Sequence, residues 1–179
     1  MTTGDEGLAA AAAAGDRAAF STLLEVHYDR VFALAFRLTG SRAEAEDLTQ
    51  DICLALPGKL AGWRGEARFT TWLYRVVVNA AHDRRRRNAT RRRQTDGWGD
   101  WEVNRRAAQA ETAEAVDWLT GTMRALPTDL RVTLALILDE EMTHAAAAEV
   151  LGVSEGTISW RVSEAKKHLR ALAEKEERI

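Results

Sequence analysis

Residues 143–161 read THAAAAEVLGVSEGTISWR and have the pattern of two short helices joined by a tight turn, the first of them capped by Thr143. Ala148 lies four residues before Gly152, where a small side chain lets one helix cross the other. Gly152 gives the backbone the freedom to turn, and Ile158 follows six residues later as an apolar residue for the shared core. We therefore predict a helix-turn-helix.

The helix after this turn, with Ser154 as its predicted N-cap, has an apolar face and an outward face. At the ~100° per residue of a helix, the apolar face comprises Ile158, Val162, Ala165, Leu169 and Leu172. The outward face comprises Trp160, Ser163, Glu164 and Lys167. Because an exposed tryptophan is costly in water, we expect Trp160 to be covered by a neighbouring helix, by DNA in the major groove or by a protein partner.

Two helices are predicted near the start of the chain. Apolar residues at helical spacing from Phe20 to Leu38 predict a helix that ends at Gly40. Ser41 is the expected N-cap of the next helix, and the glutamate three positions on would complete a capping box. We expect this second helix to end at Leu56, because Pro57-Gly58 follow it.

A loop, a third helix and a polar segment follow. Residues 59–68 are expected to form the loop, and the helix runs from Phe69 to about Arg87. Its apolar face comprises Phe69, Leu73, Val76, Val77 and Ala80. Helical spacing is lost over residues 88–110 and resumes from Ala115 to Leu126, and a further helix is expected over residues 127–138.

These elements predict an all-α protein. Hydrophobic residues make up 46% of the chain and charged residues 29%, which suffices for buried cores, and the two prolines argue against a turn-rich β-sandwich. We expect two small helical domains, residues 1–87 and 111–179, joined by a flexible polar linker of residues 88–110. Trp98 and Trp101 are unusual residues for a free linker.

The net charge of −2 conceals a segregation of charge along the chain. Residues 61–93 hold ten basic and two acidic residues, whereas residues 1–60 and 94–142 are both acidic. The densest basic parts are Arg84–Arg87 and Arg91–Arg93. One interpretation is a solvated basic linker, and the other is contact with phosphates, to which arginine offers a planar fork of donors.

Composition excludes several classes of protein. The single cysteine, Cys53, excludes an internal disulfide framework and favours a cytoplasmic location. No apolar run reaches the length of a membrane span, and the Ala9–Ala14 run lacks the preceding basic residues of a signal peptide, so we expect a helix start or a frayed tail there. We expect no cofactor, metal site or enzymatic activity, because no histidine pair has i, i+4 spacing and no phosphate-binding glycine loop occurs.

Three motifs occur in order between about Phe20 and Arg170. They are AEDLTQD at residues 45–51, FTTWLYRV at residues 69–76 followed by Asn79, and the helix-turn-helix that ends with GTIS at residues 156–159. In this order, and with a polar segment between the second and third, they resemble the extracytoplasmic-function group of bacterial sigma-70 factors. The resemblance implies a promoter-specificity subunit. Its expected partners are core RNA polymerase, promoter DNA and a cognate anti-sigma factor.

The resemblance assigns residues of the first domain to two tasks. It places the polymerase contact, with the clamp coiled coil of the largest subunit, on Asp47, Gln50 and Asp51. It places contacts with the opened −10 element on Trp63, Arg64, Arg68, Trp72, Arg75, Asn79, Arg84, Arg85 and Arg86. The amide of Asn79 can bind a base edge, whereas Trp72 fits a core position equally well.

The second domain resembles the family's −35 reader. The residues expected to contact that element are Ser154, Thr157, Ser159, Trp160, Arg161, Ser163, Lys166 and Lys167. The family often has basic residues at several positions that match Ser159, Trp160, Ser163 and Glu164, and this chain has none there, which leaves the −35 sequence open. Cys53 and Pro57-Gly58 replace larger residues common in the family, so the second helix is again expected to end early.

A conventional helix-turn-helix repressor or activator is the alternative function. Such a protein would need a ligand or dimerisation domain and would bind its operator without polymerase. The motifs within residues 47–51 and 69–79 argue against it.

Overall fold

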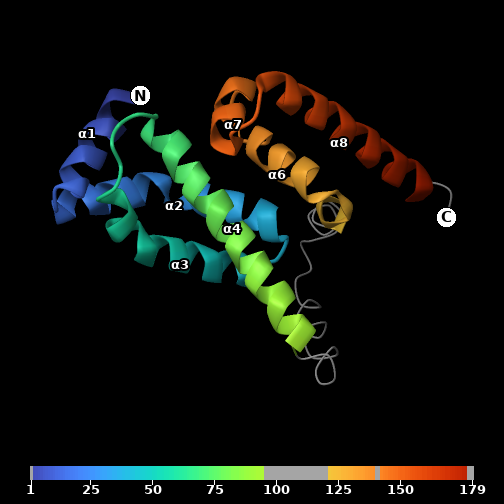
Figure 1. The fold of residues 1–179 in the computed structure, drawn as a ribbon, viewed down its shortest axis with the longest axis horizontal. Helices are drawn as coiled ribbons and strands as arrows, with labels where there is room; N and C mark the ends of the chain where they lie inside the picture. The colour runs from blue at the N-terminus through green and yellow to red at the C-terminus, as the bar shows by residue number, and fades with distance from the viewer. Residues whose placement is uncertain (1, 95–120, 140–141, 177–179) are drawn as a thin grey trace.

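The computed structural model describes residues 2–94, 121–139 and 142–176 (Figure 1). Its helices are α1 (Thr2–Ala13), α2 (Arg17–Thr39), α3 (Arg42–Leu60), α4 (Phe69–Gln94), α6 (Thr128–Ile137), α7 (His144–Leu151) and α8 (Glu155–Glu176), and residues 121–125 are also helical. We call α1 to α4 the N-terminal unit and α6 to α8 the C-terminal unit. No strand occurs in the described ranges, and the expected all-α class is confirmed.

The N-terminal unit is held together by an apolar core between α2, α3 and α4. Leu23 and Leu34 of α2, Leu48 of α3, and Phe69 and Leu73 of α4 are each 1% exposed. Burial of each such side chain contributes about 1.5–3 kcal/mol. This core fixes the outer surfaces of α3 and α4 relative to each other.

The junction between α2 and α3 carries the caps expected at a helix end and a helix start. Gly40 has φ 65°, and its amide donates to the carbonyl of Phe36. Ser41 Oγ accepts a hydrogen bond from the Glu44 amide at 3.4 Å, which confirms the predicted N-cap. The Ser41 amide, which a capping box would pair with the Glu44 carboxylate, donates instead to Thr39 Oγ1 at 3.4 Å.

Two helices are longer than expected. α3 passes through Pro57 and ends at Leu60, because the side chains of Leu56 and Leu60 are buried and stabilise the last turn despite the proline. α4 continues to Gln94 instead of ending near Arg87. Arginine, glutamine and alanine favour helices, so the loss of apolar spacing there marks the loss of a buried face rather than the end of the helix.

α1 packs against the other helices of the N-terminal unit. Ala9 is fully buried, and Asp5 Oδ2 lies 3.1 Å from Nε2 of the buried His27 on α2. The imidazole of His27 also packs against Phe69, with ring centroids 5.3 Å apart. Of the two expectations for this segment, the structure shows the helix.

The C-terminal unit contains the predicted helix-turn-helix. Gly152 has φ 65°, and its amide donates to the carbonyl of Ala148. Thr143 and Ser154 each accept a hydrogen bond, at 3.1 Å, from the amide of the third residue of α7 and α8 respectively. Ile158 is fully buried between the helices. The turn, the caps and the core residue of the motif are confirmed.

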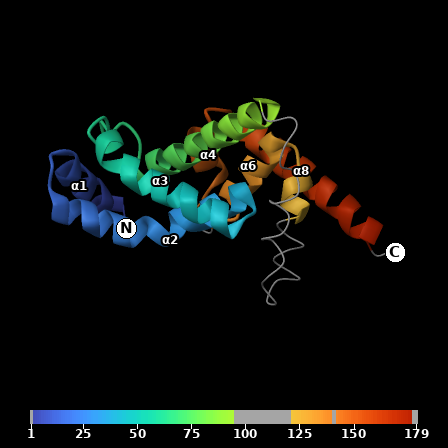
Figure 2. The same ribbon diagram turned by 90° about the horizontal axis from the view of Figure 1, so that it is seen from below.

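The two units pack directly against each other, which sequence analysis did not predict. α4 lies against α7, and α2 lies against α6 (Figure 2). We call this contact surface the seam. It buries Tyr74 and Val78 of α4 to 3% and 4% exposure. The amphipathic pattern of α4 indicated a single buried face, whereas the helix has two.

Part of the chain lies outside the described residues, including Trp98, Trp101 and Trp118. Most of the expected linker also lies there, as do the side chains of Arg91–Arg93. From the apolar set expected before Pro127, Met123 and Leu126 are described, and both are buried.

Candidate functional site

The expected polymerase-binding residues share one exposed face of α3. Asp47, Gln50 and Asp51 all point to solvent, and Leu54, one turn further on, is 82% exposed. We call these four residues the acidic face. An exposed leucine beside two carboxylates suits a partner that presents both basic and apolar side chains.

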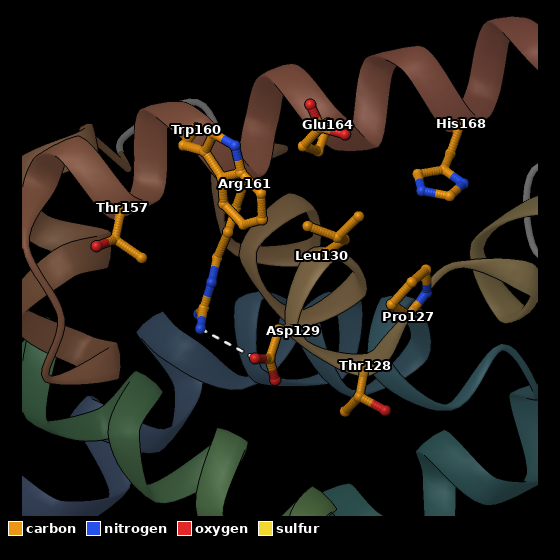
Figure 3. A pocket seen from close by; sticks show the side chains of 9 residues that line it. All are labelled: Pro127, Thr128, Asp129, Leu130, Thr157, Trp160, Arg161, Glu164 and His168. Atoms are coloured by element: carbon orange, nitrogen blue, oxygen red, sulfur yellow. Dashed lines mark hydrogen bonds and ion pairs between the residues drawn. The ribbon is translucent and has the colours of Figure 1, made fainter.

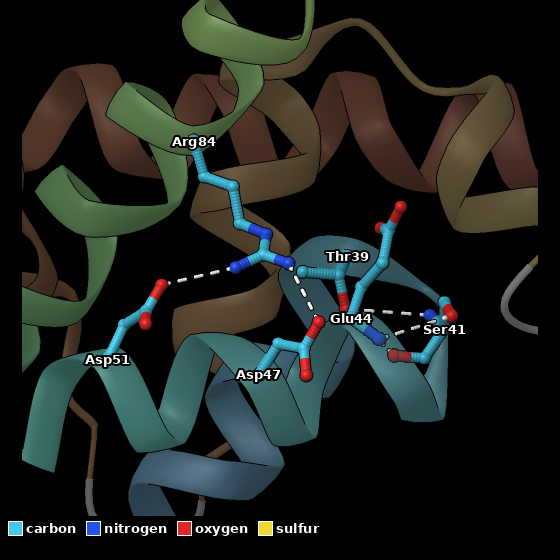
Figure 4. Close-up of polar contacts among 6 residues, drawn as sticks. All are labelled: Thr39, Ser41, Glu44, Asp47, Asp51 and Arg84. Atoms are coloured by element: carbon cyan, nitrogen blue, oxygen red, sulfur yellow. Dashed lines mark hydrogen bonds and ion pairs between the residues drawn. The ribbon is translucent and has the colours of Figure 1, made fainter.

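Arg84 of α4 bridges the two carboxylates of the acidic face (Figure 4). Its Nη2 lies 3.1 Å from Asp47 Oδ2, and its Nη1 lies 3.2 Å from Asp51 Oδ2. The Arg84 side chain is 23% exposed, whereas the two aspartates are 66% and 59% exposed. The structure therefore joins a residue expected to contact DNA to the residues expected to contact polymerase.

The other residues of α4 that are expected to contact the −10 element lie on different sides of the helix. At helical spacing, Trp72, Arg75, Asn79 and Arg86 share one side, which we call the open face. Asn79 is exposed, and Arg86 forms an exposed ion pair with Asp83 at 3.2 Å. Arg75 donates to the main-chain carbonyl of Glu149 on α7 at 2.6 Å.

Arg85 belongs to another surface of α4 than the open face. It lies about three turns beyond Tyr74 and two turns beyond Val78 on the side that meets the C-terminal unit, and it donates to Thr128 Oγ1 at the start of α6. Arg84, Arg85 and Arg86 therefore have three different environments. Of these consecutive arginines, only Arg86 lies on the open face with Asn79.

An aromatic cluster supports the loop before α4. Trp63 packs edge-on against Phe69 with centroids 6.3 Å apart, and Trp72 packs against the same ring at 5.9 Å. Both tryptophans are half-buried, whereas Arg64 and Arg68 of the loop are exposed. Trp63 Nε1 is buried and has no hydrogen-bond partner among the described residues. Trp72 thus packs against a core residue and is partly exposed at the same time.

The outward residues of α8 form two separate faces. One face is exposed and polar, and it comprises Ser159, Ser163, Lys166 and Arg170. We call it the polar face of α8. Ser159 Oγ on this face lies 3.0 Å from His144 Nδ1, which ties the start of α7 to α8.

The other face of α8 borders a groove of about 430 Å³ between α6 and α8 (Figure 3). The groove is lined by Pro127, Thr128, Asp129, Leu130, Thr157, Trp160, Arg161, Glu164 and His168. Trp160 is 61% exposed, and Arg161 Nη2 reaches across to Asp129 Oδ2 at 3.0 Å. The structure therefore turns Arg161 and Thr157 away from the polar face, which keeps Ser159, Ser163 and Lys166.

The last two residues expected at the −35 element have local partners. Ser154 Oγ lies 2.8 Å from Thr157 Oγ1 and serves as the helix cap. Lys167 is exposed and forms an ion pair with Glu164 at 2.6 Å. Glu164 is thereby partly neutralised beside the polar face.

Three residues that shape these surfaces were not among those predicted from the sequence. Leu54 could have been found, since it lies off the apolar stripe of α3 and one turn from Asp51. Tyr74 and Asp139 could not, because the hydrogen bond from Tyr74 Oη to Asp139 Oδ2, 2.9 Å long, joins residues far apart in the sequence.

No described helix has the length and apolarity that crossing a membrane requires.

Each half of the chain matches a described protein family. The family description Sigma-70 region 2 matches residues 23–91, and Sigma-70, region 4 matches residues 117–169. The ECF RNA polymerase sigma factor SigM of Mycobacterium tuberculosis is 36% identical over 170 residues, which cover 94% of this chain and 84% of that protein. SigW of Bacillus subtilis is 24% identical over 172 residues, or 87% and 89% of the two chains.

Solved structures share the fold. CnrH, determined in complex with the cytosolic domain of CnrY, superposes with a TM-score of 0.73 at 25% identity and covers 96% of this chain and 98% of its own. The sigma factor RpoE of Bartonella quintana, determined in complex with the anti-sigma factor NepR, gives a TM-score of 0.69 at 21% identity, with 87% and 96% of the chains covered. A chain that carries regions 2 and 4 in this order, and that aligns with SigM over nearly all its length, belongs to the extracytoplasmic-function group of sigma-70 RNA polymerase sigma factors.

Proposed function

We propose that this sigma factor divides its work between three surfaces. The acidic face of α3 docks on basic residues of core RNA polymerase, the open face of α4 with the loop of residues 61–68 contacts the −10 strand, and the polar face of α8 contacts the −35 element. The corresponding domains are residues 1–87 and 111–179, joined by residues 88–110. The observation that carries this proposal is the acidic face, because its two carboxylates already accept hydrogen bonds from the guanidinium of Arg84.

The −10 surface suits a single strand better than a duplex. Trp72 is half-buried and offers an aromatic ring to an unpaired base, and the exposed amide of Asn79 lies about two turns along the same side of the helix. Arg64, Arg68 and Arg86 are exposed on the loop and on the open face, where they can contact phosphates. Capture of unpaired bases would stabilise the opened promoter.

The family also suggests a further partner for this chain and the way in which it acts. The solved relative in complex with the anti-sigma factor NepR supports a cognate anti-sigma factor as a further partner of this chain. We propose that the chain acts by binding alone, in the cytoplasm, with no covalent step of its own. In keeping with this, Cys53 is half-buried on α3, where burial raises the pKa of its thiol.

Run-off transcription tests the proposal. Core polymerase with this chain should start transcription at a defined promoter, identified by mapping transcript starts after overexpression. The double substitution Asp47→Asn and Asp51→Asn should lower the affinity for core polymerase at least about tenfold, as loss of a charged contact does. Glu46→Gln is the matched control on α3, since Glu46 pairs with Arg42, whereas Asp47 and Asp51 pair with Arg84. Equal initiation with and without the protein would contradict the proposal.

A further inference from the structure

We infer that the free chain carries an anion site between α4 and α6, and that this site takes the phosphate groups of a small molecule of the diphosphate class. Arg85 of α4, Arg124 before α6 and Arg131 of α6 form the site, and we call them the arginine triad. None of the three belongs to the acidic face, the open face or the polar face of α8, so the inference does not rest on the proposed function.

The three guanidinium groups are held close to the start of α6. Arg85 donates to Thr128 Oγ1 in the first turn of that helix. Arg131 follows Thr128 by three residues, which places it on the same side of α6, and its Nη2 donates to the carbonyl of Arg124 at 3.0 Å. The guanidinium of Arg124 donates to the carbonyl of Gly40 at 2.7 Å. Hydrogen bonds thus fix three positive charges from separate segments in one place.

The charge of the triad is not neutralised by a carboxylate within the part of the chain that the structure describes. Its hydrogen bonds go to a hydroxyl and to main-chain carbonyls. Asp129, in the first turn of α6, pairs instead with Arg161 at 3.0 Å across the groove between α6 and α8 (Figure 3). Burial lowers the pKa of Arg131, and the charges of Arg85 and Arg124 lower that pKa further. Like charges therefore repel one another in the triad, and a bound anion would offset this repulsion.

Hydrogen-bond donors remain available around the triad. Arg131 Nε is buried and has no hydrogen-bond partner among the described residues. α6 also begins without a side-chain cap, because its N-cap residue is Pro127. The amides of its first turn therefore lack a side-chain acceptor, and the positive end of the helix dipole adds to the charge of the triad. Guanidinium groups, first-turn amides and the hydroxyl of Thr128 are donors of the kind that phosphate oxygens accept.

The charge and burial of the triad favour a small phosphate compound over a nucleic-acid strand. Arg85 and Arg124 are exposed and can be reached from solvent, whereas Arg131 is half-buried behind them. A phosphate monoester carries a charge of about −1.5 to −2, and a diphosphate carries more within one compact group. Each backbone phosphate of DNA carries a single charge, and successive phosphates are spread along the strand. A diphosphate therefore matches the three clustered charges best.

Calorimetric titration of the free full-length chain with sodium pyrophosphate, at constant ionic strength, tests the inference. Binding should saturate, and Arg85→Gln and Arg131→Gln should each weaken it about tenfold or more, as loss of a charge-assisted contact does. Arg86→Gln is the matched control, because it removes the same charge one residue further along α4 from an arginine that pairs with Asp83. Its affinity should change less than about twofold, since exposed charges outside the site are screened. Arg124→Gln, at an exposed position, is the further variant should Arg131→Gln fail to fold.

A competition experiment distinguishes the two sources of phosphate. An oligo-dT of about 12 nucleotides, a length typical of single-strand sites, should leave the affinity for pyrophosphate unchanged. Displacement of pyrophosphate by the oligo-dT would assign the triad to backbone phosphates and overturn the inference. Failure of pyrophosphate to saturate the parent chain at about 10 mM also overturns it, since weaker binding amounts to general screening. So does an affinity that Arg85→Gln and Arg124→Gln leave unchanged, or one that Arg86→Gln lowers as much as they do.

Discussion

Arg84 and Asp47 form an ion pair of 3.1 Å between α4 and α3, and the same guanidinium reaches Asp51. The pair places a basic residue of the arginine tract on the surface proposed to bind polymerase. In the free chain, Arg84 fills the position that a basic side chain of polymerase would take. Arg84 therefore belongs both to the arginine tract expected to contact DNA and to the surface proposed to bind polymerase.

Replacement of Arg84 tests this sharing. Exposed ion pairs contribute about 0–1 kcal/mol each, so Arg84→Ala should raise the affinity for core polymerase about two- to fivefold by removing an internal competitor. Arg86→Ala is the matched control, because Arg86 pairs with Asp83 and does not reach the acidic face. Titration of labelled core polymerase at two salt concentrations measures the effect. Weaker binding by Arg84→Ala would show that Arg84 holds the carboxylates in place for docking.

Asn79 is expected to act in strand opening rather than in duplex binding. Its exposed amide lies on the open face, where it can contact an unpaired base. Asn79→Ala should lower the permanganate reactivity of thymines in the −10 region while leaving the fraction of promoter-bound polymerase unchanged. Asn88→Ala, an exposed asparagine elsewhere on α4, serves as the control. Unchanged permanganate reactivity would count against the role of Asn79.

Trp160 is expected to matter for function more than for stability. Because it is 61% exposed, Trp160→Ala should change the free energy of unfolding by less than about 1 kcal/mol, whereas Ile158→Ala, at a fully buried position, should lower it by about 2–5 kcal/mol. Urea unfolding measures both. Run-off transcription by Trp160→Ala should fall at the same time, since the side chain borders both the groove and the polar face.

Gly152 and Gly156 provide a test of the turn. A Cβ at Gly152 would meet nothing within 4 Å, so Gly152→Ala isolates the cost of its positive φ, which is about 1–2 kcal/mol. Gly156 lies in the first turn of α8 without a positive φ, and Gly156→Ala should be neutral or stabilise by up to about 1 kcal/mol. Thermal unfolding of the two variants should show shifts of opposite sign or a shift for Gly152→Ala alone.

The contact between Tyr74 and Asp139 across the seam gives the packing of the two units a dependence on high pH. Burial, followed by the charge of Asp139 and the hydrogen bond to it, raises the pKa of Tyr74 well above the ordinary tyrosine value of about 10. The neutral phenol is thus favoured in the folded chain, so the contribution of Tyr74 to stability is constant below about pH 10 and is lost as the pH rises further. The phenolate absorbance of the parent chain minus that of Tyr74→Phe should titrate above the ordinary value. A difference curve centred at that value would show that Tyr74 is not held in the seam.

Sequence patterns predicted the helix-turn-helix well because its determinants are local. The caps at Thr143 and Ser154, the positive φ of Gly152 and the buried Ile158 all depend on residues within one or two turns. Three motifs in order also sufficed for the family. Asp47, Gln50 and Asp51, which the resemblance assigns to the polymerase contact, are all exposed on one side of α3.

Errors arose where distant residues decide the outcome. The end of α3 was misplaced because burial of Leu60 outweighs the effect of Pro57, and burial depends on helices elsewhere in the chain. The seam was missed because Tyr74 and Val78 lie beside, not within, the apolar stripe of α4. The partners of Arg84 and Arg85 likewise come from α3 and α6, which no local pattern reveals.

The direction of each consecutive side chain makes the arginine tract of α4 chemically heterogeneous. Arg84 meets carboxylates, Arg85 meets a hydroxyl of the other unit, and Arg86 stays beside its own helical neighbour Asp83. Because successive residues of a helix are rotated by ~100°, the three consecutive arginines are not interchangeable. The number of arginines that this tract can offer to a polyanion is therefore set by the direction in which each side chain leaves the helix, and not by the length of the tract. Moving the tract by a single position along α4 would give every one of these arginines a different partner.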